Sequence, residues 1–258
     1  MHPILFEIGG FQVRTYGVLV LLGFLAGVWF AKENLKKFGI RENKVWDAAI
    51  WAMIFGVIGA RLFYVIENWD YYKLNLGEIF AIWHGGLIFY GILFGVIPVL
   101  WYIYREKWNF WAVLDSAIPG ITLGIAIGRW GCFFNGCCYG KPTDLPFGVV
   151  FPEGSEPHLE FGDVPIHPSQ IYESFGDAIL FLLYVFLLRR FGAERPGLVG
   201  SIALIFTSFV RFLVDFTRHY KPNAYIFGLT FNQWIALSIM ILGVILLFRV
   251  NAKAHKAP

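Results

Sequence analysis

The stretch from residue 128 to residue 140, GRWGCFFNGCCYG, gathers residue types that can bind an anion. Arg129 keeps its positive charge at any pH below about 12, and burying a lone guanidinium beside hydrocarbon is costly. The surrounding glycines let backbone come close to a ligand, and a guanidinium fork suits carboxylates and phosphates. The stretch therefore indicates a site for a negatively charged ligand. The alternative is that Arg129 extends to a membrane interface and the glycines only pack helices.

All three cysteines of the chain, Cys132, Cys137 and Cys138, lie in this stretch. Structural zinc sites use four ligands at well-separated positions, and adjacent cysteines seldom share one ion, so we expect no metal here. A disulfide from Cys132 to one of the other two would form in an oxidising compartment. A nucleophilic cysteine would need a base within hydrogen-bond reach. Inert packing is the interpretation that the sequence favours.

The composition predicts a membrane protein. Apolar residues make up 57% of the 258-residue chain, and charged residues only 15%, where soluble domains carry about a quarter. The mean hydropathy is +0.60. The net charge of +3 is small and no basic tract is present, which argues against a nucleic acid as partner.

Seven apolar stretches are long enough to cross about 30 Å of hydrocarbon, which predicts an all-α, seven-span fold. They are Thr15–Ala31, Val45–Ile66, Gly86–Tyr104, Phe110–Ile127, Ser169–Leu188, Leu198–Phe216 and Ile226–Phe248. Lysine and arginine concentrate in the connections 32–44, 105–107, 189–195 and 249–256, which the positive-inside rule places in the cytoplasm. The amino terminus is then outside and the carboxyl terminus inside, as seven crossings require.

We expect one membrane domain over residues 1–258, because the sequence shows neither an internal repeat nor a linker. Two outer connections are too long to be turns. Residues 67–85 mix polar and apolar side chains and are expected to lie along the interface as a short amphipathic helix. Residues 139–168 are rich in proline, glycine and acids, and they predict a small extracytoplasmic cap with a strand at 148–151.

Polar residues within or beside the spans gather toward the outer side of this topology. They are Tyr16, Arg61, His84, Arg129, Glu173, Asp177, Arg211, Asp215 and Arg218, whereas only Asp47 and Asp115 lie on the inner side. Intramembrane charges mark functional sites, and an excess of arginine at one depth predicts a chamber for an anionic lipid headgroup. The alternative is a set of structural ion pairs, among them Arg211 with Asp215, four residues apart on one helix face.

His84 stands before two glycines, so little side-chain bulk lies beside it and it can face a cavity. With an unperturbed pKa of about 6.5, it can accept a proton from a thiol or hydroxyl. The alternative is a histidine that caps a helix at the interface. His167 precedes Pro168 at the start of a predicted helix, and we interpret it as a structural or orienting residue.

Five motifs together resemble the bacterial prolipoprotein diacylglyceryl transferases. The first is G-R-x-G-x-F-F-N-x-x-x-x-G over residues 128–140. The others are T-Y-G at 15–17, H-G-G-L at 84–87, H-P-S-Q-I-Y-E at 167–173 and R-F-x-x-D-F-x-R at 211–218. They stand in the same order as in that family and cover most of the chain.

The resemblance implies a cofactor-free transferase of the bacterial inner membrane, with its site toward the periplasm. Its expected partners are phosphatidylglycerol and a prolipoprotein signal peptide, whose lipobox cysteine receives the diacylglyceryl group while glycerol phosphate is released. Arg129 and Arg211 resemble the family's essential arginines, and His84 and Tyr16 resemble residues near its reaction centre. The expected substrate-binding set is Arg129, Arg211, Asn135, Gly140, Arg61, Arg218 and Asp215.

The departures from the family signature are specific. Cys132 and Cys137 stand where the family usually has Asn and Glu, and Asp215 where it often has Glu. Two hydrogen-bonding groups are thereby lost, which implies a differently arranged site or an altered activity, with Asn135 taking over part of the polar role. The rival interpretations are a diverged homologue that only binds the lipid and a carrier of anionic lipid. A carrier would place its site near the bilayer midplane between repeated halves. Oligomeric state is not readable from the sequence.

Overall fold

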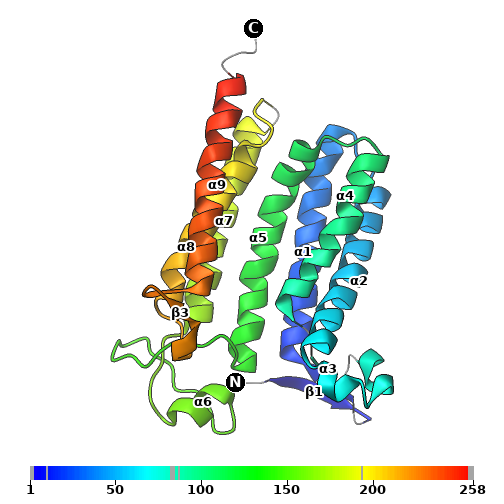
Figure 1. Cartoon of the computed structure of the whole chain (residues 1–258). Coiled ribbons are helices and arrows are strands. Elements are labelled where there is room, and N and C mark those ends of the chain that lie inside the picture. The colour runs from blue at the N-terminus through cyan, green and yellow to red at the C-terminus, as the bar shows by residue number, and fades with distance from the viewer. Residues whose placement is uncertain (1–2, 10, 82–84, 87, 193, 255–258) are drawn as a thin grey trace. The chain divides into compact units, whose positions relative to one another are not determined.

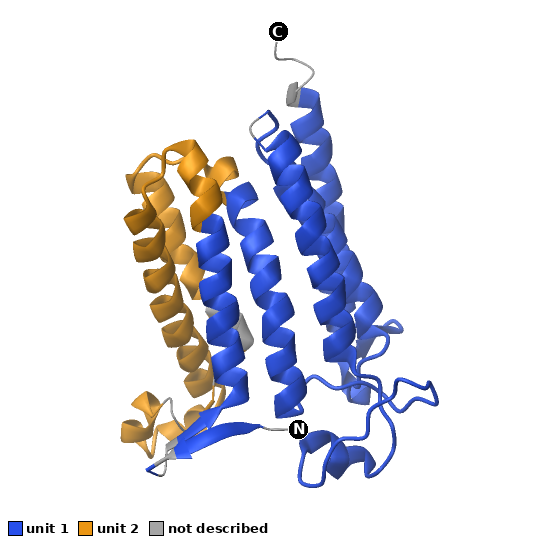
Figure 2. Ribbon diagram, turned by 180° about the vertical axis from the view of Figure 1, so that it is seen from behind, with its two compact units in different colours: residues 1–31, 114–258 blue, residues 32–113 orange. Residues whose placement is uncertain are grey.

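The computed structural model describes residues 3–9, 11–81, 85–86, 88–192 and 194–254. The chain forms two compact units (Figure 2): unit 1 consists of Met1–Ala31 with Leu114–Pro258, and unit 2 is Lys32–Val113. Within the described residues, six helices are long and apolar enough to cross a membrane (Figure 1). They are α1 (Thr15–Leu35), α2 (Glu42–Glu67), α5 (Phe110–Asn135), α7 (Ser169–Phe191), α8 (Leu198–Asp215) and α9 (Phe231–Ala254). The predicted helical, membrane-spanning class is confirmed.

The predicted span Gly86–Tyr104 takes a different form. The chain makes a 3-10 helix, η4 (Phe89–Gly95), and then the ten-residue α4 (Val96–Arg105). At typical rises of about 2.0 and 1.5 Å per residue, the two pieces together extend about 29 Å. η4 packs closely on α2 because Gly91 has no side chain, so its backbone can approach the backbone of Ala60. Six of the seven predicted spans are therefore supported, while the seventh and the orientation of the termini stay predictions.

In unit 1, α1 and α5 pack through glycines. A Cβ placed on Gly23 would lie 2.6 Å from the carbonyl oxygen of Gly124, and one on Gly27 would lie 2.6 Å from that of Gly120. Only glycine permits such an approach, because any side chain would overlap the facing backbone. This contact fixes α5 against α1, and Arg129 lies in the last two turns of α5.

The remaining long helices of unit 1 pack on α8, which contacts both α7 and α9. A buried apolar cluster joins α7 to α8 and consists of Leu180, Tyr184, Leu188, Val199 and Ala203. The fully buried Asp115 of α5 accepts hydrogen bonds from the backbone N–H groups of Gly197 (2.7 Å) and Gly200 (2.8 Å). These N–H groups lie at the amino end of α8, where a helix leaves donors unpaired. Asp115 thus joins α5 to α8.

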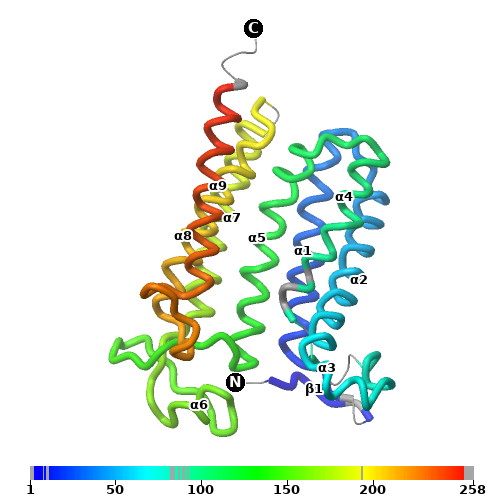
Figure 3. Tube along the Cα trace, in the orientation of Figure 1, coloured from blue at the N-terminus to red at the C-terminus, as the bar shows by residue number. Residues whose placement is uncertain are grey.

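Residues 136–168 connect α5 to α7 (Figure 3) and contain the short helix α6 (Glu156–Phe161). The predicted strand at 148–151 is wrong, because only a single bridge from Val149 to Ile166 forms there. Prolines at 146, 152 and 165 remove ladder donors on both sides of that bridge. A cap outside the membrane at this segment stays a prediction.

Two short hairpins were not predicted. β1 (Ile4–Ile8) pairs antiparallel with β2 (Phe11–Arg14), and β3 (Tyr225–Ile226) pairs with β4 (Leu229–Thr230) after a 3-10 turn, η5 (Pro222–Ala224). Both belong to unit 1.

Unit 2 contains α2, η4 and α4, and a 3-10 turn, η1 (Lys36–Phe38), leads into α2. Its buried apolar cluster consists of Leu35, Ile40, Val45 and Val113. The arm predicted at 67–85 as one amphipathic helix is two short pieces, α3 (Trp69–Tyr72) and the 3-10 helix η2 (Leu76–Phe80).

Candidate active site

Two of the predicted arginines meet at one carboxylate in unit 1. Glu173, in the second turn of α7, accepts Arg129 Nη2 at 2.6 Å on one oxygen and Arg211 Nη1 at 3.2 Å on the other. The Glu173 side chain is 7% exposed, and those of Arg129 and Arg211 are 20% and 24% exposed. Three helices thus bring two guanidiniums together, as predicted, while Glu173 keeps the pair from lying uncompensated in an apolar region.

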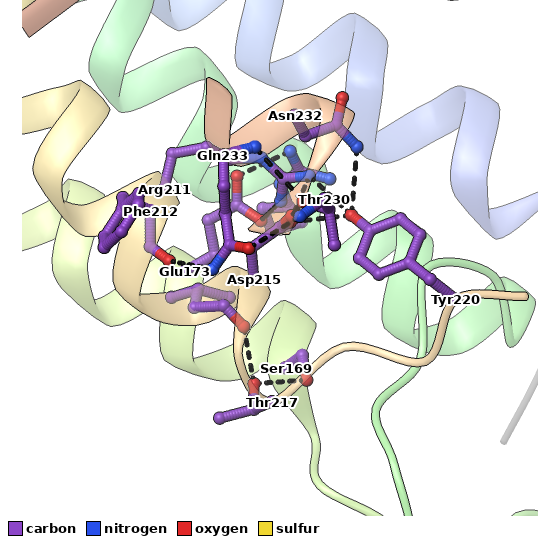
Figure 4. A network of polar contacts seen from close by, with 12 residues as sticks. Ser169, Glu173, Arg211, Phe212, Asp215, Thr217, Tyr220, Thr230, Asn232 and Gln233 are labelled. Carbon is purple, nitrogen blue, oxygen red and sulfur yellow. Dashed lines mark hydrogen bonds and ion pairs between the residues drawn. The ribbon is translucent and has the colours of Figure 1, made fainter. Parts of the chain in front are cut away.

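Arg211 is held from its other side by a second carboxylate (Figure 4). Its Nη2 lies 2.8 Å from Asp215 Oδ1, which confirms the ion pair predicted from the four-residue spacing. The Tyr220 hydroxyl donates to the same oxygen at 2.6 Å and accepts from Arg211 at 3.1 Å. Thr230 donates to the other oxygen of Asp215, and Asn232 donates to Tyr220 at 3.1 Å. The guanidinium of Arg211 therefore has a fixed orientation.

Burial raises the pKa of the Tyr220 phenol above its ordinary value. The hydroxyl therefore stays protonated at neutral pH and acts as a donor to Asp215. This donor role fits the short distance between the two oxygens, because an ionised phenol would repel the carboxylate.

Two buried arginine nitrogens in this unit have no partner among the described residues. They are Nε of Arg129 and Nε of Arg218. Arg218 follows α8, its backbone bridges to Gly140, and its guanidinium lies 5.5 Å from the centre of the Tyr220 ring. A buried donor without an acceptor costs about 1–3 kcal/mol, so both arginines retain capacity for an anionic ligand.

Tyr16 lies beside the end of α5. Its backbone and ring pack 3.3 Å from the position that a Cβ on Gly131 would take, and its side chain remains partly exposed. The structure therefore places Tyr16 against the segment of α5 that carries Arg129 and Cys132.

Gly140 and His167, both singled out in the sequence, contact each other. The Gly140 N–H donates to the His167 carbonyl at 3.1 Å, and a side chain at 140 would overlap His167 and lie 2.7 Å from Ser169 Oγ. Burial lowers the pKa of the His167 imidazole, and Lys141 adds to the effect. Gly140 therefore packs directly against His167, and the orienting role of His167 stays a prediction. Asn135 ends α5 with an exposed side chain.

Arg61, in unit 2, differs from its predicted role. Its guanidinium donates to the carbonyl oxygens of five residues, at distances from 2.5 to 3.4 Å: Glu78, Ile79, Ala81, Gly85 and Gly86. A guanidinium carries five N–H donors, so these carbonyls account for all of them. We therefore assign Arg61 to organising the segment after α3 rather than to binding lipid. His84, the predicted base, lies outside the described residues.

The three cysteine sulfurs lie within 4.8 Å of one another, and all three are free thiols in this structure. Cys132 is buried in the last turn of α5, and Cys137 and Cys138 are half-buried just beyond it. The sequence argument against a shared ion rested on the four well-separated ligands of structural zinc sites and on the adjacency of Cys137 and Cys138. The fold nevertheless brings both of these thiols close to Cys132.

Sequence reasoning missed several parts of the site. Tyr220, Thr230 and Asn232 come from the connection after α8 and from the start of α9, where no motif marks them. Gln170 is 1% exposed and donates to the Cys137 carbonyl at 2.7 Å. In the sequence, only the position of Gln170 within the stretch HPSQIYE pointed to a role in the site.

Comparison with known proteins decides the family. The family profile described as prolipoprotein diacylglyceryl transferase matches residues 3–249. The chain belongs to this family. Among its relatives is the phosphatidylglycerol–prolipoprotein diacylglyceryl transferase of Finegoldia magna, 36% identical over 100% of this chain and 99% of the relative. The proteins of the same name from Nitratidesulfovibrio vulgaris (36% identical; 100% of this chain, 97% of the relative) and Thermosynechococcus vestitus (32%; 98% and 94%) are similar along their length.

Proposed function

We propose that this protein transfers the diacylglyceryl group of phosphatidylglycerol to the cysteine thiol of a prolipoprotein signal peptide, releasing glycerol phosphate. Its full-length relatives carry this activity in their name. The observation that carries the proposal is the convergence of Arg129 and Arg211 on Glu173, while Nε of Arg129 has no partner within the described part of the chain. Such a fork is what a phosphate diester needs in an apolar setting.

The proposed reaction is attack of sulfur on a glycerol carbon with loss of a phosphate ester. Negative charge grows on the leaving phosphate, and fixed guanidiniums stabilise that charge best where water is excluded. Arg129 binds the phosphate through its free nitrogen, while Arg211 is held in place by Asp215 and Tyr220. We propose His84 as the base that takes the thiol proton and Tyr16 as the group that positions the thiol. No metal is required at the phosphate.

The topology expected from the sequence belongs to the same proposal. We propose a single bacterial inner-membrane domain in which η4 and α4 complete a seventh crossing, because their combined rise of about 29 Å approaches the hydrocarbon thickness of about 30 Å. The arginine site is then on the periplasmic side, where α5 and α8 end and α7 and α9 begin. This side is the one on which a lipobox peptide would be presented.

A transfer assay tests the proposal against both rivals. Purified protein in vesicles of phosphatidylglycerol is incubated with a lipobox peptide, and the peptide is weighed by mass spectrometry. We expect a mass gain equal to one diacylglyceryl group and an equimolar release of glycerol phosphate. Lipid binding without mass gain would instead support the diverged homologue, and lipid movement between leaflets without mass gain would support the carrier.

A further inference from the structure

The three-cysteine cluster formed by Cys132, Cys137 and Cys138 is the part of the site that the proposed reaction leaves unused. Its sulfur atoms all lie within 4.8 Å of one another. An ion that holds thiolates in a tetrahedron at about 2.3 Å separates their sulfurs by about 3.8 Å. The distances between the sulfur atoms therefore need to shorten by about 1 Å or less for the three thiolates to bind one ion.

The end of α5 explains how the chain brings Cys137 back to Cys132. Gly136 adopts the left-handed conformation (φ 75°), and its N–H donates to the Phe133 carbonyl at 3.2 Å. The Cys137 N–H then donates to the Cys132 carbonyl at 3.1 Å. This pair of bonds is the Schellman ending of a helix, and it reverses the chain over the last turn.

Cys138 reaches the cluster at the expense of backbone strain. Its φ is 62°, which non-glycine residues adopt at a cost of about 1–3 kcal/mol unless the surroundings impose it. Two bonds hold this stretch from outside: Gln170 donates to the Cys137 carbonyl at 2.7 Å, and His219 N–H donates to the Tyr139 carbonyl at 3.1 Å. Strain of this kind is concentrated at functional sites, which supports a functional role for the third thiol.

The exposure of the three thiols differs from that of a closed structural site. Cys132 is buried, whereas Cys137 and Cys138 are half-buried. Within the part of the chain that the structure describes, the group contains these three ligands and no fourth. Zinc sites with three protein ligands and an open fourth position are the catalytic kind.

We propose that Cys132, Cys137 and Cys138 bind one thiophilic divalent cation of the zinc class and leave its fourth position to the thiol of the peptide substrate. This inference rests on the proposed transfer reaction and deepens it. The substrate thiol binds the cation as thiolate, and its proton passes to the base. A sulfur lone pair then forms the bond to the glycerol carbon. The carbon–oxygen bond breaks and its electron pair leaves with the phosphate, so no atom changes oxidation state.

The charges around the cluster suit this arrangement. A divalent ion with four thiolates carries a net charge of about −2, which requires nearby cations in a buried setting. Arg129 lies one turn before Cys132 on the same helix face, and Arg218 bridges to Gly140 just after Cys138. The cluster also accounts for the two departures from the family signature, because thiol ligands replace the expected Asn and Glu.

Cobalt binding measured on the purified full-length protein tests the inference without depending on activity. Reduced protein is titrated with Co²⁺, and the sulfur-to-cobalt charge-transfer band is recorded before and after addition of a lipobox peptide. The matched variant is Cys138→Gly, because glycine suits a φ of 62° and the variant loses only the thiol. We expect one Co²⁺ per wild-type chain, and a band that shifts with the cysteine peptide but not with its serine version. The affinity of Cys138→Gly should fall more than about 100-fold, while its metal-free melting temperature does not fall.

The inference would be overturned by tight Co²⁺ binding to Cys138→Gly, by a charge-transfer band that does not change when the peptide is added, or by thiol titration that finds a disulfide in place of a metal site. Transfer at the full rate by chelator-treated, metal-free protein would also overturn it and would leave the proposed function intact. A cobalt band that responds to the peptide in a protein unable to transfer lipid would instead refute the proposed function and keep the metal site.

Discussion

Arg129→Lys separates a phosphate-binding role from a purely structural one. A lysine at 129 keeps a positive charge beside Glu173, now 2.6 Å from Arg129 Nη2, but it loses the Nε donor that has no partner among the described residues. Lysine also lacks the planar fork that binds two oxygens at once. If Arg129 only pairs with Glu173, the lysine variant should behave nearly as wild type.

The expected magnitudes follow from these contacts. Removing one donor to the charge that develops in a transition state slows catalysis about 10²–10³-fold, or about 2.7–4 kcal/mol. Because the ion pair survives, stability should fall by no more than about 1 kcal/mol, a shift in melting temperature of about 2–4 °C. Arg129→Ala loses the pair as well. Its stability loss should be about 2–3 kcal/mol. This is less than the roughly 3–5 kcal/mol lost when one partner of a fully buried ion pair is removed, because the Arg129 side chain is 20% exposed.

The assay measures kcat/KM for transfer to a lipobox peptide in phosphatidylglycerol vesicles, together with the melting temperature of each variant in the same detergent. The reasoning fails if Arg129→Lys retains more than a third of wild-type kcat/KM. It also fails if the losses of activity in the two variants merely follow their losses of stability.

The remaining predictions concern four residues. Tyr220→Phe removes the hydroxyl that lies 3.1 Å from Arg211, and we expect a stability loss of about 1–3 kcal/mol and slower turnover with unchanged pH dependence. Gly27→Ala puts a Cβ 2.6 Å from a carbonyl of α5 and should cost about 1–3 kcal/mol in thermal unfolding. Arg61→Ala leaves buried carbonyls without donors and should make the 78–86 segment sensitive to limited proteolysis. His84→Gln should remove the limb of the pH–rate profile near about 6.5.

Matched controls exist for these variants. Gly17→Ala lies in the same helix as Gly27 with nothing within 4 Å of the new Cβ, so it should be neutral or slightly stabilising. Lys73→Ala removes a pair with Asp70, whose side chain is 97% exposed, and should leave proteolysis unchanged. Equal destabilisation by the two glycine variants would refute the helix contact. An unchanged pH–rate profile in His84→Gln would remove it as the base.

The sequence by itself determined the membrane class, six of the long helices and the presence of arginines within or beside the spans. These follow from local properties: apolar length sets the spans, and a charge within a span must have a function or a partner. The spacing of Arg211 and Asp215 was enough to predict their ion pair, because helix geometry alone brings such residues together. The family motifs added the chemistry that charge alone could not specify.

Only the tertiary structure decided what each polar group contacts. Glu173 joins Arg129 and Arg211 because three helices bring distant positions to one point, and no local pattern encodes that meeting. The Arg61 guanidinium donates hydrogen bonds to backbone carbonyls of the segment after α3, and the sequence did not predict the path of that segment. Adjacent cysteines were not expected to share one ion, yet left-handed residues at 136 and 138 bring both thiols close to Cys132. Spacing along the chain predicts neighbours within a helix, whereas a chain reversal after its end depends on backbone angles that the surrounding fold imposes.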